Sequence, residues 1–190
     1  MVVTDPPDPL ADLTRRLAGH TRVFSTGTVL DSLRFRVHLG ERLGVCPADV
    51  QAAVVGEHGT SMLLLWSAAT VAGVPVLDIL SAHAEPVEAF RQQVETEIRY
   101  ANISIIEGLG ASQYGIGAVT ARLAEAVLRD ERALFTVAAY HSEHRVTLSL
   151  LAVLGREGVH QMHLPAMTPT EAEALEASAE ILRRAVEHIT

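Results

Sequence analysis

The sequence contains no lysine, so all 15 of its basic residues are arginines; they stand against 23 aspartates and glutamates, for a net charge of −8. A chain this acidic is poorly suited to bind the phosphate backbone of a nucleic acid. Without lysine it has neither a Schiff-base nucleophile nor the phosphate-binding lysine of a Walker loop. Arginine remains available to bind a carboxylate through two parallel hydrogen bonds.

Cysteine and long apolar runs are scarce as well. The single cysteine, Cys46, excludes an internal disulfide and a thiolate metal cluster, and we expect it to be a buried or half-buried small residue. The longest apolar runs fall far short of the roughly 20 residues that a membrane span needs, and the N-terminus has no signal-peptide pattern. We therefore expect a cytoplasmic protein that binds neither nucleic acid nor membrane.

The composition is that of an ordinary globular protein, with 48% hydrophobic residues. A length of 190 residues favours one domain. Apolar residues at helical spacing predict helices over 10–17, 27–43, 86–106 and 116–128. Thr168, Pro169 and Glu171 form a capping box that predicts the start of a last helix. Strands are predicted at 52–55 and, as a hairpin, at 133–140 and 146–154. Prolines predict an extended or turning segment at 5–9, and the state of 61–71 stays open.

Two stretches carry residues suited to chemistry. On a helix over 27–43, Asp31 and Arg34 share a face because they are three residues apart. His58 lies between glycines directly after a predicted strand, where the backbone can approach a ligand closely. Taken alone, the first pair reads as a solvated ion pair and the histidine as a structural one.

Together the two stretches suggest a specific reaction. A histidine held by a carboxylate, beside an arginine that binds a substrate carboxylate, can move a proton on and off the oxygen of a 2-hydroxy acid. The carboxylate would favour the imidazolium form and raise the pKa of His58. The carbon half of such a reaction needs a hydride carrier, which no side chain can supply.

The sequence resembles the lactate/malate dehydrogenase family, and within it the L-lactate dehydrogenases, over nearly its whole length. The motifs that carry the resemblance are VTDP at 3–6, GTVLDSLRFR at 27–36, GEHG at 56–59, WSAA at 66–69 and ASQYGIG at 111–117. The resemblance implies an α+β fold with long helices packed on antiparallel sheet, and NAD as cofactor. It also implies that the chain interconverts a 2-hydroxy acid and a 2-oxo acid when a dinucleotide-binding half completes it.

The same resemblance implies a role for each matching position. His58 would be the proton donor and acceptor, Asp31 its carboxylate partner and Arg34 the residue that binds the substrate carboxylate. Ser112 would lie beside the substrate, and Ile116 would line the nicotinamide.

Three positions depart from the family pattern. Asp5 stands where the family has an asparagine near the substrate oxygen, so a second carboxylate there could raise the pKa of His58 further or repel an anionic substrate. Thr60 replaces the usual aspartate after the GEHG motif. Arg36 matches an arginine that binds a sugar-bisphosphate activator in allosteric members, but Gln51 stands where those members have a histidine, which argues against the same regulation.

Only 30 residues precede Asp31, too few for the dinucleotide-binding half with which the family begins. We therefore expect 1–26 to be the end of that half with a connecting segment, and 27–190 to be the substrate domain, with little or no activity alone. A truncated reading frame or a separate dinucleotide-binding polypeptide would explain this arrangement. Loss of the covering half also predicts a homo-oligomer.

Several alternatives remain. A non-catalytic module for oligomerisation or 2-oxoacid binding would keep Arg34 and leave His58 idle. An unrelated hydrolase is disfavoured because no serine or cysteine sits in a nucleophile elbow. The pairs His141/His144 and His160/His163 fall in loop or strand sequence, where their spacing should not bring the rings together, so we expect surface histidines and no metal site.

Overall fold

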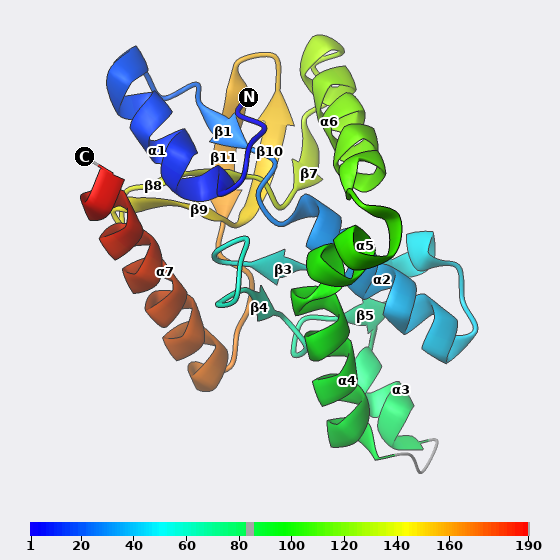
Figure 1. Cartoon of the computed structure of the whole chain (residues 1–190). Helices are drawn as coiled ribbons and strands as arrows, with labels where there is room; N and C mark the ends of the chain where they lie inside the picture. The colour runs from blue at the N-terminus through cyan, green and yellow to red at the C-terminus, as the bar shows by residue number, and fades with distance from the viewer. Residues whose placement is uncertain (83–85, 190) are drawn as a thin grey trace.

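The computed structural model describes residues 1–82 and 86–189 and has the α+β architecture that the sequence predicts. The helices are α1 (Pro7–Ala18), α2 (Val29–Leu43), α3 (Val76–Ala82), α4 (Val87–Arg99), α5 (Ala101–Leu109), α6 (Gln113–Leu128) and α7 (Pro169–Ile189), with a short 3-10 turn at Pro47–Asp49 (Figure 1). The strands are β1 (Phe24–Ser25), β2 (Val50–Gln51), β3 (Val54–Val55), β4 (Leu63–Leu64), β5 (Thr70–Val71), β6 (Val74–Pro75), β7 (Ala133–Phe135), β8 (Ala138–His141), β9 (Val146–Ser149), β10 (Leu151–Gly155) and β11 (Gly158–His163). No helix among the described residues is long and apolar enough to cross a bilayer.

The strands form small antiparallel sheets in the orders β1-β8-β9, β11-β10-β7, β2-β5-β6 and β3-β4. The predicted hairpin is confirmed, since β8 pairs with β9 in register. The predicted length of its two strands is wrong, because each is interrupted. The first is divided into β7 and β8 and the second into β9 and β10, and β7 and β10 pair with each other in another sheet. The interruption at Thr136 leaves its carbonyl free to accept the backbone N–H of Thr28, at 3.1 Å, just before α2 begins.

Two further expectations need correction. The segment 5–9 is not wholly extended, because Pro7 to Pro9 form the first turn of α1, where a missing N–H leaves no helical hydrogen bond unmade. The single helix expected over 86–106 is divided at Tyr100, whose φ of −105° and ψ of 6° depart from helical values. The capping box is confirmed: Thr168 Oγ1 accepts the N–H of Glu171, and a carboxylate oxygen of Glu171 accepts the N–H of Thr168.

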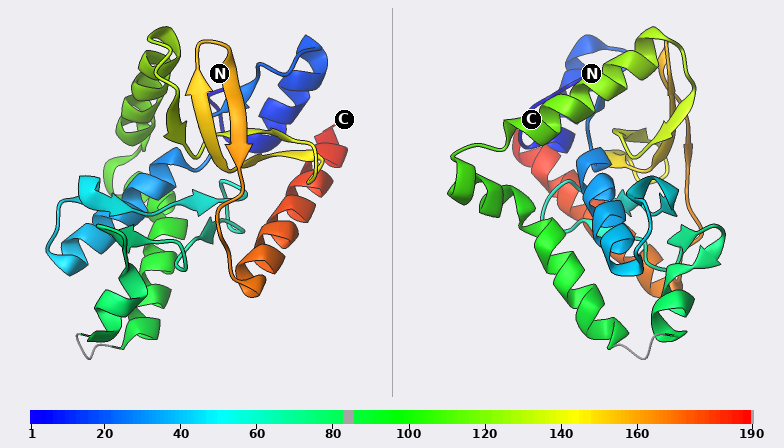
Figure 2. Two further views of the ribbon diagram at one scale, coloured as in Figure 1. Left: turned by 180° about the vertical axis from the view of Figure 1, so that it is seen from behind. Right: turned by 90° about the vertical axis from the view of Figure 1, so that its right-hand side faces the viewer.

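The core lies between the sheets and the helices that cover them. Helix α7 packs on β9, and α6 packs on β10, so these two helices lie on different sides of the strands of the C-terminal half (Figure 1, Figure 2). An apolar cluster fills each of these two interfaces. A third cluster lies between α2 and α4 and includes Phe35 and Trp66, whose rings meet edge to face with centroids 4.8 Å apart. The three clusters hold α2 and β3 in place, and these are the elements that carry the site.

The N-terminal helix is fastened to this body by a buried carboxylate. Asp12 on α1 is fully buried, and its Oδ2 accepts both the backbone N–H and the hydroxyl of Thr147 on β9, at 3.1 and 2.9 Å. Its Oδ1 accepts hydrogen bonds from Arg15 and Arg16. Loss of the Asp12 carboxylate would leave all these donors without an acceptor, so Asp12 should contribute strongly to the stability of the fold.

We predict that Asp12→Ala lowers the free energy of unfolding by about 2–4 kcal/mol, since it strands donors that are buried or partly buried. Denaturant unfolding followed by circular dichroism measures the change. Asp49→Ala removes an exposed carboxylate from the 3-10 turn and should stay within about 0.5 kcal/mol of the unsubstituted chain. Equal losses in the two variants would contradict this account of Asp12.

Candidate active site

Asp31 joins the two other residues that the sequence singled out. It lies in the first turn of α2 and is fully buried. Its Oδ2 lies 2.6 Å from Nδ1 of His58, and its Oδ1 accepts a hydrogen bond from Nη1 of Arg34 at 3.1 Å. One carboxylate therefore orients both an imidazole and a guanidinium.

The start of α2 is held where Asp31 can make these bonds. Gly27 has a φ of +49°, and a Cβ at this position would lie 2.4 Å from Ser149 Oγ and 2.5 Å from the backbone nitrogen of Ala138. Only glycine lets the chain pass this closely to β8 and β9. The hydroxyl of Thr28 then donates to the carbonyl of Val54 on β3, at 2.5 Å, which ties α2 to the strand that leads to His58.

The loop that follows β3 is anchored on two sides. The N–H of Glu57 donates to Ser178 Oγ on α7, at 2.9 Å, and the N–H of His58 donates to Asp8 Oδ2 on α1, at 2.8 Å. Gly56 allows the close approach to α7, because its φ is +85° and a Cβ there would lie 2.7 Å from Ser178 Oγ. Together with the bond from Asp31 on α2, contacts with α1 and α7 thus position the histidine.

The electrostatics of the site favour a charged histidine. Burial opposes protonation of His58, but the hydrogen bond and charge of Asp31, with the charges of Asp8 and Asp5, outweigh it and raise the pKa of His58 above its usual value. Burial raises the pKa of Asp8 to about 6. The expectation that a carboxylate raises the pKa of His58 agrees with this arrangement.

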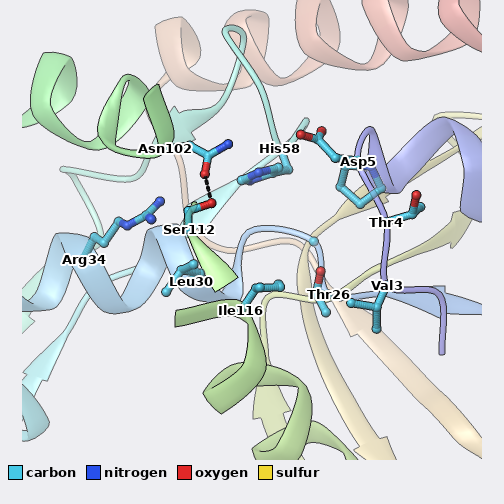
Figure 3. A pocket seen from close by; sticks show the side chains of 12 residues that line it. Val3, Thr4, Asp5, Thr26, Leu30, Arg34, His58, Asn102, Ser112 and Ile116 are labelled. Atoms are coloured by element: carbon cyan, nitrogen blue, oxygen red, sulfur yellow. Dashed lines mark hydrogen bonds between the residues drawn. The ribbon is translucent and has the colours of Figure 1, made fainter. Parts of the chain in front are cut away.

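A cavity of about 210 Å³ lies in front of the histidine and is lined by most of the predicted site residues (Figure 3). Asp5, Arg34, His58, Ser112 and Ile116 all line it, whereas Asp31 lies behind His58 and Arg34. Apolar side chains cover another part of the wall, namely those of Val3, Leu30 and Ile116. The cavity therefore combines a cation, a titratable ring and an apolar surface.

Sequence reasoning missed two residues at this site. Asn102 on α5 lines the cavity, and its side-chain oxygen accepts the hydroxyl of Ser112 in a short hydrogen bond. Asp8 supports the histidine loop from behind. A lone amide in the apolar sequence of α5 was a visible signal for Asn102, but nothing local distinguishes Asp8 from a helix-starting aspartate.

Comparison with known proteins identifies the family of the chain. The model of the lactate/malate dehydrogenase α/β C-terminal domain matches residues 28–190. The chain belongs to the lactate/malate dehydrogenase family. Curated relatives include L-lactate dehydrogenases of Deinococcus radiodurans, 46% identical over 184 residues, and of Thermus aquaticus, 41% identical over 192 residues. These alignments cover 96% and 97% of this chain but only 60% and 62% of the relatives.

The solved structures show the same relation. The minor L-lactate dehydrogenase from Enterococcus mundtii superposes with a TM-score of 0.94 at 29% identity, over all of this chain and 62% of that one. The chain therefore has the fold of the C-terminal domain of a lactate/malate dehydrogenase and spans about three fifths of the length of its relatives.

Arg36 is the residue for which the sequence suggests anion binding. It does not line the cavity beside His58. Its Nε donates to the carbonyl of Ala52 at 3.0 Å, and the residue lines a separate groove of about 390 Å³ between α2 and α6. Arg122 lines the same groove. An anion bound at Arg36 would therefore not share the space in front of His58.

Two minor expectations for this family member are wrong. Cys46 is exposed rather than buried or half-buried. The rings of His141 and His144 do come together, with centroids 5.0 Å apart, because the β8–β9 turn folds back and His144 binds Glu176 on α7. Burial and the charge of His144 lower the pKa of His141. Among residues 1–82 and 86–189, no group of three or more metal-ligating side chains is arranged to hold a metal ion.

We predict that Asp31→Asn lowers the pKa of His58, because it removes the negative charge that stabilises the imidazolium. Histidine ring chemical shifts followed by NMR over pH 5–9, about the window in which imidazoles titrate, measure the change. Asp49→Asn, remote and exposed, should leave the titration unchanged. An unaltered His58 in folded Asp31→Asn would contradict the electrostatic account.

The raised pKa also links folding to pH. Since folded His58 binds its proton more tightly than unfolded histidine does, its contribution to stability is complete below about pH 6.5 and is lost as pH rises through the folded pKa. Thermal unfolding of His58→Gln should lack this component of the pH dependence.

Proposed function

We propose that this chain is the substrate domain of an NAD-dependent L-2-hydroxyacid dehydrogenase, which interconverts a lactate-type 2-hydroxy acid and its 2-oxo acid. The observation that carries the proposal is the bridge from Asp31 to both Arg34 and His58, with the latter two opening on one cavity. The naming of its relatives as L-lactate dehydrogenases supports the substrate class.

Each residue has a chemical task in this mechanism. Because a carboxylate only accepts hydrogen bonds, we assign the hydrogen between His58 and Asp31 to Nδ1 of His58, which leaves Nε2 to exchange a proton with the substrate oxygen. Imidazolium gives that proton to the ketone of a 2-oxo acid, and neutral imidazole takes it back from the alcohol. Arg34 binds the substrate carboxylate, because a guanidinium offers paired donors to two carboxylate oxygens. Ser112, held by Asn102, supplies a hydroxyl to the same cavity.

The residues present fit one end of the cofactor. The apolar wall formed by Val3, Leu30 and Ile116 suits the face of a nicotinamide ring beside His58. When bound, the reduced cofactor NADH would supply a hydride to the carbonyl carbon of the 2-oxo acid, and the oxidised form NAD+ would accept that hydride from the 2-hydroxy acid. Within residues 1–82 and 86–189, no glycine-rich turn lies between a strand and a helix to hold the pyrophosphate, so our proposal assigns the remaining contacts to another dinucleotide-binding segment.

Several features of the whole enzyme belong to the same proposal. We place the end of the dinucleotide-binding half and its connection at 1–26, and the substrate domain at 27–190. A separate dinucleotide-binding polypeptide, or a longer form of this chain, would complete the site. The cytoplasmic location stays a prediction, as does anion binding at Arg36, where Gln51 argues against the regulation of the allosteric members.

The first test is NADH oxidation with pyruvate, glyoxylate and oxaloacetate, by the chain alone and with a complementing dinucleotide-binding half. We expect turnover only on complementation, and a loss of at least about 100-fold in His58→Ala, since a positioned general acid contributes that much. Arg145→Ala, on the distant β8–β9 turn, is the control. Turnover that survives in His58→Ala would refute the assignment.

Arg34→Ala should weaken binding of pyruvate by roughly 30-fold or more, because the charge-assisted pair with the substrate carboxylate is lost. Arg34→Lys should recover only part of the loss, since ammonium lacks the planar pair of donors. Pyruvate-dependent thermal stabilisation measures binding without turnover. If it depends on Arg34 while no complementation yields turnover, the chain is a 2-oxoacid-binding module instead.

Asp5→Asn should strengthen pyruvate binding by roughly fivefold, because it removes a carboxylate from the cavity that receives an anion. It should also lower the pKa of His58, to which the charge of Asp5 contributes. Isothermal calorimetry and histidine NMR measure the two effects. Weaker binding in Asp5→Asn would indicate that Asp5 instead accepts a hydrogen bond from the ligand.

We also propose a homo-oligomer, since apolar side chains are exposed on α2 and β7, at Leu33, Val37 and Leu134. Sedimentation velocity from about 1 to 100 µM, the range in which modest interfaces associate, tests it. A single monomeric species at all concentrations would contradict the proposal.

A further inference from the structure

One buried carboxylate near the site has no task in the proposed reaction. Asp8, in the first turn of α1, is 1% exposed. Its Oδ1 accepts the hydroxyl of Ser25 at 3.1 Å, and its Oδ2 accepts the N–H of His58 at 2.8 Å. Among the described residues, no arginine forms an ion pair with it.

Such a group is unfavourable for the fold itself. A buried carboxylate that forms no ion pair with an arginine loses its hydration without a paired guanidinium charge in compensation. Burial raises the pKa of Asp8 to about 6, so the surroundings of Asp8 disfavour its charged form. A neutral amide of the same shape could also accept the N–H of His58. The carboxylate is therefore a poor choice for stability alone, and the group nearest to benefit from its charge is the imidazole of His58.

The charges around His58 come from four directions. Helix α2 contributes Asp31 and Arg34, the segment before α1 contributes Asp5, and α1 contributes Asp8. Glu57 lies in the histidine's own loop, where its carboxylate accepts the hydroxyl of Ser61 at 2.5 Å. Of these, Asp31 holds the ring and Asp8 holds the peptide.

We propose that Asp8 is a positioning residue for His58, which fixes the peptide of the histidine loop against α1 and adds a negative charge that favours the imidazolium. Its value for catalysis rests on the proposed function, but its action on His58 does not require turnover. Positioning of this kind matters because a general acid must meet the substrate oxygen at hydrogen-bond distance.

Two substitutions separate the two effects. Asp8→Asn keeps an oxygen that accepts the N–H of His58, and the NH2 group of the new side chain can donate a hydrogen bond to Ser25 Oγ. Asp8→Ala removes both acceptors. We expect the proton affinity of His58 to fall roughly three- to tenfold in both variants. Exchange of the His58 amide hydrogen should accelerate at least tenfold in Asp8→Ala and change little in Asp8→Asn.

Asp12→Asn is the matched control, since Asp12 is a second buried aspartate on α1 that bonds Thr147 and does not contact His58. It should alter stability but leave the titration and amide exchange of His58 unchanged. NMR of the chain in the absence of substrate measures both, and circular dichroism verifies folding.

The result that overturns the proposal is a folded Asp8→Asn chain whose His58 titrates as before, or effects on His58 that Asp12→Asn reproduces. If Asp8→Ala does not fold, Asp8→Asn still decides the effect of the charge. Failure of the dehydrogenase proposal would appear separately, as absent turnover with the shifts in His58 intact.

Discussion

The site depends on a single buried carboxylate that serves two partners. Asp31 is fully buried, with one oxygen toward the imidazole of His58 and the other toward the guanidinium of Arg34. A carboxylate in such surroundings is tolerated because its hydrogen bonds replace lost hydration. Since both partners are fixed by the same group, the imidazole and the guanidinium are placed relative to each other with little freedom.

That arrangement depends on contacts far from the cavity. Gly27 lets the start of α2 pass close to β8 and β9, and the break between β7 and β8 frees a carbonyl for the first turn of the helix. From the other side, Ser178 on α7 receives the N–H of Glu57. Asp8 on α1 accepts the N–H of His58, so the histidine loop is sensitive to the docking of both terminal helices.

Features of the fold that short-range interactions set were predictable from the sequence, and features that long-range packing sets were not. Helices α1, α2, α6 and α7 were predicted because the repeat of apolar residues is written within each segment. The residues of the candidate site were found through a resemblance carried by contiguous motifs. The division at Tyr100 was not predicted, and nothing in the described contacts explains it. The pairing of β7 with β10 and the approach of His141 to His144 were not predicted either, since both involve segments far apart in the sequence, the latter through the contact of His144 with Glu176.

By itself, the sequence determined the chemical inventory. It has arginine without lysine, one cysteine, a histidine between glycines and an aspartate one helical turn before an arginine. Local spacing is sufficient for such conclusions because neighbours on a helix must share a face. Only the tertiary structure decided that Asp31 meets His58 across 27 residues, that Asp8 supports the peptide of that histidine and that Arg36 faces another groove. Those relations arise from the burial of three separate apolar clusters, and no local pattern encodes how such clusters close on one another.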